Sequence, residues 1–325
     1  VITAGAVSSE PVAPSPKRDA ILGFSVGIVL GIVLMLCIDY VDDRVRGPED
    51  MERALPDEPL YGEIPNLEAL ATSPVLDLDD QRADTDTLAG VEAYRALATS
   101  LEFANIDDAP RILQVTSPIA GEGKSTTVAN LASAFAATGI RVALVDADLR
   151  RPKMHEFFAV DNDAGLTTFV VGRTDLAESV SHPTGHPGLT VLTAGPATPD
   201  AAKVLHSEAT EKLLDRLRQD HDLVILDTPP VLPLADALIV AQLTDLVVLV
   251  ARAGSTGRRS LRSARAAIEN VDGPPLAVVL NNAPRSGIGH DDYYGTYANS
   301  RDTSTATPEG EPSRRRFRGR AKSST

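Results

Sequence analysis

The sequence predicts an α/β protein: a mostly parallel β-sheet with helices on both faces, preceded by one transmembrane helix and followed by a disordered tail. From Arg111 onward, short apolar runs rich in Val, Leu and Ile alternate with helical patterns, which is typical of parallel strands that are buried on both faces. An uncharged apolar stretch near the N-terminus predicts the membrane helix. The pattern ends near residue 285, and the polar composition beyond it predicts disorder.

Composition limits the class of protein. The chain has 325 residues and a net charge of −14, which argues against nucleic acid as a partner of the folded part, because such partners require a basic face. Cys37 is the only cysteine, so an intramolecular disulfide and a cysteine-based metal cluster are excluded. The chain begins with Val1, and we expect either a fragment of a longer protein or a non-standard start codon translated literally.

The first 38 residues predict a connector and a membrane span. Residues 1–19 are rich in Pro, Ser, Ala and Val, which is typical of an extended connector. Residues 20–38 carry no charge, and as a helix they span about 29 Å, close to the hydrocarbon core of a bilayer. A signal peptide is the alternative, but acidic residues follow at once and no small-residue cleavage pattern does. Gly23, Gly27 and Gly31 fit either close packing against another helix or simple tolerance of glycine in membrane helices.

Residues 39–87 predict a juxtamembrane segment and a linker. Residues 47–65 suggest a short helix, a proline-bounded turn and an extended piece. Residues 71–87 hold five Asp and no helical periodicity, which is typical of a solvated linker. A helix over residues 88–103 then leads into the main domain, residues 88–285.

The main domain alternates strands and helices. Expected strands are Ile112–Thr116, Val142–Asp146, Leu189–Thr193, Leu223–Asp227, Leu246–Ala251 and Leu276–Leu280. Expected helices cover residues 124–138, 164–171, 207–219, 235–242 and 258–270. Residues 286–325 form the expected disordered tail, which holds three tyrosines and a basic run over residues 314–318.

A phosphate-binding motif follows the first strand of this domain. Residues 120–126 (AGEGKST) lie between that strand and the next helix, so glycines can turn backbone N–H groups inward at a helix N-terminus. Lys124 can reach the β- and γ-phosphates, and the Ser125 hydroxyl can bind Mg²⁺. The full pattern has glycine where this chain has Pro118. The motif predicts a P-loop NTPase-like fold that binds ATP, and hence a cytoplasmic domain; the expected nucleotide-binding residues are Ser117, Gly121, Glu122, Gly123, Lys124, Ser125 and Thr126.

Aspartates end two further strands. Asp146 and Asp148 follow one strand within DADLRR, and Asp227 ends another before TPP. The carboxyl ends of parallel strands form the crevice where open α/β sheets bind ligands. Carboxylates, a hydroxyl, waters and phosphate oxygens are the ligands that Mg²⁺ prefers, so we expect Mg²⁺ there.

In combination, these motifs and a terminal tyrosine cluster resemble the bacterial tyrosine autokinases (BY-kinases) of capsular and exopolysaccharide synthesis. The resemblance implies that Lys124 binds phosphate and that Asp146 acts as base toward the acceptor hydroxyl. It implies a metal held by Ser125, Asp148 and Asp227. It also implies that the tail tyrosines within DDYYGTY are the phosphoacceptors, namely Tyr293, Tyr294 and Tyr297.

The N-terminal part carries a second resemblance. Residues 11–65 are similar to the end of a Wzz-type chain-length determinant domain, with its proline-rich approach, membrane helix and PED-containing segment. The two resemblances imply a protein of the bacterial plasma membrane that works with the polysaccharide polymerisation and export machinery. They also imply association with further copies of itself and a protein-tyrosine phosphatase that resets the tail.

Two positions depart from the family pattern. The family loop has proline four residues before the lysine, where this chain has Ala120. The family's E-x-x-R-x-x-R helix, which helps to assemble its rings, is here Glu92, Arg95 and Ala98, so the second arginine is missing. Loss of a charge at a subunit contact changes association more than fold, which leaves ring formation open.

Two alternatives remain from the sequence alone. The partition and septum-site ATPases share this loop and fold, but they place a lysine where this chain has Ile119 and lack a tyrosine tail behind a membrane helix. A scaffold of a different class is the second alternative: a membrane-anchored nucleotide-binding subunit that controls polymer length without phosphorylating protein.

Overall fold

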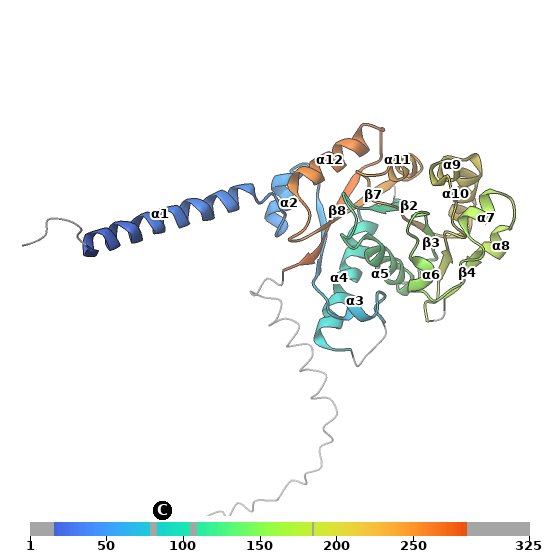
Figure 1. Ribbon diagram of the computed structural model, residues 1–325. Coiled ribbons are helices and arrows are strands. Elements are labelled where there is room, and N and C mark those ends of the chain that lie inside the picture. The colour runs from blue at the N-terminus through green and yellow to red at the C-terminus, as the bar shows by residue number, and fades with distance from the viewer. Residues whose placement is uncertain (1–15, 79–82, 105–108, 184, 285–325) are drawn as a thin grey trace, which may run out of the picture.

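The computed structural model describes residues 16–78, 83–104, 109–183 and 185–284 (Figure 1). Residues 1–15 of the connector expected over residues 1–19, the tyrosine cluster and the basic run lie outside this part of the chain, whereas residues 16–19 belong to the first helix rather than to an extended connector. One eight-stranded sheet, of order β1-β8-β7-β2-β6-β3-β5-β4, forms the centre. All its pairings are parallel except that of β4 with β5, so the predicted α/β class is confirmed.

The elements follow the predicted alternation. The strands are β1 (Leu60–Pro65), β2 (Ile112–Thr116), β3 (Val142–Asp146), β4 (Val180–Ser181), β5 (Leu189–Leu192), β6 (Leu223–Asp227), β7 (Leu246–Arg252) and β8 (Leu276–Ala283). The helices are α1 (Pro16–Val41), α2 (Pro48–Ala54), α3 (Ala69–Thr72), α4 (Thr85–Glu102), α5 (Lys124–Ala137), α6 (Met154–Phe157), α7 (Leu166–Val170), α8 (Leu176–Ser179), α9 (Ala201–Leu205), α10 (Glu208–Asp220), α11 (Asp236–Ala241) and α12 (Arg258–Glu269).

Alternate residues of the central strands face two separate helical layers. In β2, Leu113 and Val115 pack into the core beneath α4 and α5, whereas Ile112 faces the layer that contains α9 and α10. In β7, Val248 faces the first layer and Val247 packs with α2, α11 and α12. Because side chains alternate along a strand, an almost wholly apolar strand contributes side chains to both layers.

Residues 60–65 are extended, as expected, and they also form a strand of the sheet. β1 pairs in parallel with β8, with Leu60 opposite Val278 and Glu63 opposite Leu280. Ile64 is fully buried in the core, so this edge of the sheet is built from a segment that precedes the phosphate motif by more than fifty residues.

Residues 74–76 lie against α5, which differs from the expected solvated linker. The Asn130 side chain accepts a hydrogen bond from the Leu76 N–H (2.8 Å) and donates one to the Pro74 carbonyl (2.8 Å). Leu76 itself is 3% exposed. The helix that follows, α4, begins at Thr85, and the Asp84 carboxylate caps it by accepting a hydrogen bond from the Thr87 N–H.

The N-terminal helix α1 extends away from the sheet (Figure 1). It runs over Pro16–Val41, and its stretch Pro16–Cys37 is long and apolar enough to cross a membrane, with its side chains exposed. Just after α1, the chain docks on the loop between β7 and α12. Val45 exchanges backbone hydrogen bonds with Thr256 (2.8 Å) and Gly254 (2.7 Å).

Candidate nucleotide and phosphoryl-transfer site

The predicted site residues gather at the carboxyl edge of the sheet because of the strand order. β6 lies between β2 and β3, so Asp227 at the end of β6 is directly opposite both Val115 and Asp146. The phosphate loop follows β2 and therefore starts beside these aspartates. This is the edge at which open parallel sheets bind their ligands.

The phosphate loop has the backbone shape that its glycines permit. Gly121 and Gly123 adopt φ values of +87° and +90°, which are unfavourable for residues with a Cβ. α5 begins immediately afterwards at Lys124, so its unpaired N–H groups face the loop. Backbone N–H groups at a helix N-terminus suit an anion such as phosphate.

Two residues of the loop point inward. The Ser117 hydroxyl donates to the Ile119 carbonyl (2.7 Å), and Ser117 is fully buried. The Glu122 side chain is also fully buried; one of its oxygens accepts from the Ile119 N–H (2.9 Å) and the other from the Thr256 hydroxyl. Among the predicted nucleotide-binding residues, the side chains of Ser117 and Glu122 therefore support the loop, whereas Lys124, Ser125 and Thr126 are only partly buried.

Lys124 joins the aspartates of the neighbouring strands. Its Nζ lies 2.8 Å from Asp148 Oδ2 and 3.5 Å from Asp227 Oδ1, and it donates to Ser125 Oγ at 3.2 Å. Burial acts to lower the pKa of Lys124, but the carboxylates of Asp227 and Asp148 outweigh it, so the pKa lies above its ordinary value. Lys124 is therefore a cation held among buried carboxylates at the mouth of the loop.

Asp146 is placed differently from Asp148. Its Oδ2 accepts hydrogen bonds from the backbone N–H groups of Lys153 and Met154, both at 2.9 Å, while its buried Oδ1 has no partner among the described residues. Burial and the neighbouring Asp227 raise the pKa of Asp146 to about 7. A fixed carboxylate with one unused oxygen and a raised pKa is suited to accept a proton.

The donors present fit a magnesium ion. Asp227 Oδ2 is buried and has no partner among the described residues, and Asp148 and Ser125 lie beside it through their shared contact with Lys124. The described residues contain no cluster of three or more His, Cys, Asp or Glu side chains arranged for a metal. Magnesium does not require such a cluster, because it keeps several waters and binds phosphate oxygens.

Arg150 fixes the loop that follows β3 and carries Asp148. Its guanidinium makes two hydrogen bonds to Asp236 at the start of α11, at 2.6 and 3.1 Å, and Asp236 is 2% exposed. A bidentate pair of this kind holds both the distance and the orientation of its partners. The sequence contains no local signal for Asp236, because it lies 86 residues from Arg150.

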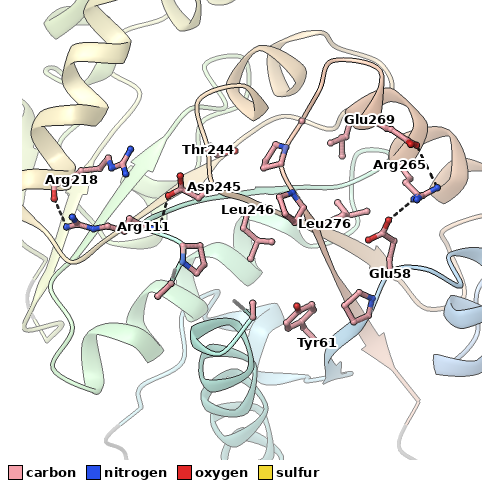
Figure 2. A pocket seen from close by; sticks show the side chains of 18 residues that line it. Glu58, Tyr61, Arg111, Arg218, Thr244, Asp245, Leu246, Arg265, Glu269 and Leu276 are labelled. Atoms are coloured by element: carbon pink, nitrogen blue, oxygen red, sulfur yellow. Dashed lines mark hydrogen bonds and ion pairs between the residues drawn. The ribbon is translucent and has the colours of Figure 1, made fainter. Parts of the chain in front are cut away.

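A separate cavity of about 900 Å³ lies at the opposite edge of the sheet, where β2, β7 and β8 begin (Figure 2). Two of its labelled arginines have partners in the cavity wall: Arg265 lies 2.6 Å from Glu58, and Arg111 donates to the Arg218 carbonyl at 2.6 Å. The phosphate loop follows the other end of β2, so this cavity is not part of the candidate site.

Comparison with known proteins agrees with the geometry. Residues 111–271 match a family model described as an AAA domain. The tyrosine-protein kinase YwqD of Bacillus subtilis is 38% identical over 208 residues, covering 64% of this chain and 87% of YwqD. The chain belongs to the bacterial tyrosine-protein kinases.

Longer members of the family and a solved kinase domain are also similar. The tyrosine-protein kinase etk of Escherichia coli K12 is 30% identical over 302 residues, covering 87% of this chain but 41% of etk. The structure of the kinase domain of E. coli ETK has a TM-score of 0.65 and 28% identity, and covers 72% of this chain and 94% of that one. The kinase described here thus spans most of YwqD but less than half of etk.

The structure gives a physical reason for Ala98 in this kinase. Glu92 and Arg95 form an ion pair on the exposed face of α4 (2.8 Å), and Arg95 also donates to the Leu78 carbonyl (3.0 Å). Ala98, one turn further along α4, is instead 2% exposed and packed in the core. An arginine at this position would place its charge in an apolar environment, which is unfavourable unless the charge is paired.

Proposed function

We propose that this kinase binds Mg-ATP at the phosphate loop and transfers the γ-phosphate to tyrosines of its own tail. The observation that carries the proposal is the convergence of Lys124, Asp148 and Asp227 at the end of the loop, with the Lys124 ammonium 2.8 and 3.5 Å from the two carboxylates. Phosphoryl transfer depends mainly on positioning and charge stabilisation, which is what such a cluster supplies.

Each residue takes a distinct role in this proposal. Lys124 exchanges its carboxylate partners for the β- and γ-phosphates, while Ser125, Asp148 and Asp227 hold the metal. Bound Mg²⁺ supplies neutralisation of the charge that develops on the phosphate oxygens. Asp146, with its unused buried oxygen, accepts the proton of the tyrosine hydroxyl.

The last strand of the sheet ends near this site. β8 ends at Ala283, and Asn281 within it donates to the Glu122 carbonyl of the phosphate loop (3.0 Å). Tyr293 is ten residues beyond Ala283, so the chain can span up to about 35 Å between them. This reach allows a tyrosine to enter its own site or that of a neighbour, and the resemblance to ring-forming BY-kinases favours the neighbour.

The proposed setting follows from the relatives and from α1. We propose that the kinase is anchored in the bacterial plasma membrane by α1, with the catalytic domain in the cytoplasm, and regulates polymerisation or export of a capsular polysaccharide or exopolysaccharide. Its proposed partners are further copies of itself, the polymerisation and export machinery and a protein-tyrosine phosphatase. Phosphates on the tail each add about −1.5 to −2 charges, so repulsion from the carboxylates of the site loosens the assembly.

Transfer between subunits is tested by mixing two full-length chains in detergent. One carries Lys124→Met with its tyrosines intact; the other is active but carries Tyr293→Phe, Tyr294→Phe and Tyr297→Phe. We expect phosphotyrosine on the Lys124→Met chain, because only a neighbour can supply the active site. A chain that stays unlabelled, while wild-type protein labels itself at a rate independent of concentration, would mean that transfer occurs within one subunit.

The membrane anchor predicts a simple fractionation result. The full-length protein should sediment with membranes and resist carbonate extraction, because a helix as apolar as α1 stays in the bilayer. A shortened chain that begins at Asp42 should be recovered without detergent, since it retains the docking of Val45 on the loop after β7. Recovery of the full-length protein in the soluble fraction without detergent would contradict the anchor.

A further inference from the structure

The phosphate loop is held from one side by the ends of β7 and β8. Arg252, the last residue of β7, donates from Nη1 to the Gly121 carbonyl (3.1 Å). Asn281 of β8 donates from Nδ2 to the Glu122 carbonyl (3.0 Å). Two successive carbonyl groups of the loop are thus drawn toward the same two strands.

These contacts determine where the loop's N–H groups point. In a trans peptide the C=O and N–H of one unit are directed oppositely. The peptide whose carbonyl bonds Arg252 therefore directs the Glu122 N–H away from β7, and the peptide whose carbonyl bonds Asn281 directs the Gly123 N–H away from β8. In the strand order, the side of β2 opposite β7 and β8 is occupied by β6 and β3, which carry Asp227 and Asp146.

The Glu122 side chain fastens the loop at a third point. Its carboxylate accepts from the Thr256 hydroxyl, and both residues are fully buried. The Thr256 oxygen in turn accepts from the Arg252 N–H (2.7 Å), so the hydroxyl proton is directed to Glu122. The Ile119 N–H donates to the other carboxylate oxygen of Glu122 (2.9 Å). This N–H group is therefore not available to bind phosphate.

Gly123 permits the approach of Asn281 to the loop. A Cβ at this position would lie 2.0 Å from Asn281 Nδ2, and the backbone φ of +90° is itself unfavourable for other residues. Glycine at 123 is thus required both for the turn and for the approach of Asn281.

We propose that Arg252, Thr256 and Asn281 are positioning residues that orient the phosphate loop so that the N–H groups of Glu122 and Gly123 face the nucleotide phosphates. The proposal rests on the nucleotide site described above and assigns the Glu122 carboxylate to loop support. These residues act through the loop and do not themselves carry out phosphoryl transfer.

The test measures nucleotide affinity as well as activity in the full-length protein. Thr256→Val removes the hydroxyl with little change of shape, Thr256→Ser retains it, and Thr210→Val is a matched control. Thr210 is also buried and donates to a backbone carbonyl (2.7 Å), but it lies in α10. Titration calorimetry gives the Kd of MgADP, and steady-state kinetics give KM for ATP and kcat.

We expect Thr256→Val to weaken MgADP binding and raise KM for ATP by about tenfold or more, as for loss of a hydrogen bond to a charged group. Thr256→Ser and Thr210→Val should remain within about twofold of wild type. Unchanged MgADP affinity in a folded Thr256→Val protein, or a loss that Ser does not restore, would overturn the proposal.

A second variant keeps the proposal testable if Thr256→Val does not fold. Asn281→Ala removes the donor to the Glu122 carbonyl at a half-buried position, and the same rise in the Kd of MgADP is expected. Unchanged affinity in this variant would overturn the role of Asn281. Because MgADP binding requires no phosphoryl transfer, failure of this inference is distinguishable from failure of the kinase proposal.

Discussion

Replacing Lys124 with Met is expected to reduce phosphoryl transfer to tyrosine by about 10³-fold or more. Lys124 is the cation at the mouth of the phosphate loop, and Met keeps the length of its side chain without the charge. The same substitution leaves Asp148 and Asp227 without their shared ammonium, and unpaired buried carboxylates are destabilising. We therefore also expect Lys124→Met to have a lower Tm than wild type, and we expect Mg²⁺ to reverse part of this decrease.

The measurement is incorporation of labelled γ-phosphate by the full-length protein, with Tm recorded with and without Mg²⁺. Lys212→Met is the matched control, because Lys212 makes an exposed ion pair with Glu208 on α10 (2.7 Å), far along the chain from the loop. Incorporation by Lys124→Met at the rate of this control would remove the kinase assignment from this site.

Asp146→Asn and Asp148→Asn are expected to impair different properties of the kinase: the first lowers kcat and the second weakens binding. Asp146→Asn should lower kcat by about 10²- to 10⁴-fold, the usual contribution of a general base, while the Kd of MgADP stays within a few-fold of wild type. The Asn carbonyl can still accept from the Lys153 and Met154 N–H groups, so the loop keeps its anchor. Asp148→Asn should instead weaken the Mg²⁺-dependent binding of nucleotide, because Asp148 is a proposed ligand of the metal. Its carboxylate lies at the mouth of the loop, 2.8 Å from the Lys124 ammonium.

Calorimetry of MgADP binding and measurement of kcat on the same preparations separate the two roles. Loss of metal-dependent binding in Asp146→Asn, together with unimpaired binding in Asp148→Asn, would mean that the assigned roles are exchanged.

The central strands could be predicted from sequence because their apolar runs are local signals. Ile112–Thr116, Val142–Asp146 and Leu223–Asp227 have the expected bounds in the structure. The membership of β1 in the sheet could not be predicted in this way. Its sequence LYGEIP contains glycine and proline, and its partner β8 lies more than 200 residues later in the chain.

The site likewise contains residues that local sequence patterns predict and residues that only the fold brings together. The phosphate motif and the strand-end aspartates are local patterns, and the structure brings Lys124, Asp148 and Asp227 within hydrogen-bonding distance. The supports of the loop come from distant segments: Arg252 lies 131 residues from Gly121, and Asn281 lies 159 residues from Glu122. Glu122 was expected among the nucleotide-binding residues from its place in the motif, but only the fold reveals that its carboxylate faces Thr256.

Mapping of phosphate by mass spectrometry tests the central claim most directly. Full-length protein, freed of phosphate by a phosphatase, is incubated with ATP and Mg²⁺ and then digested, with release of inorganic phosphate measured in parallel. We expect phosphotyrosine at Tyr293, Tyr294 or Tyr297, dependent on Mg²⁺ and lost in Lys124→Met. Hydrolysis of ATP without phosphotyrosine anywhere in the chain would contradict the autokinase proposal and favour a nucleotide-binding scaffold.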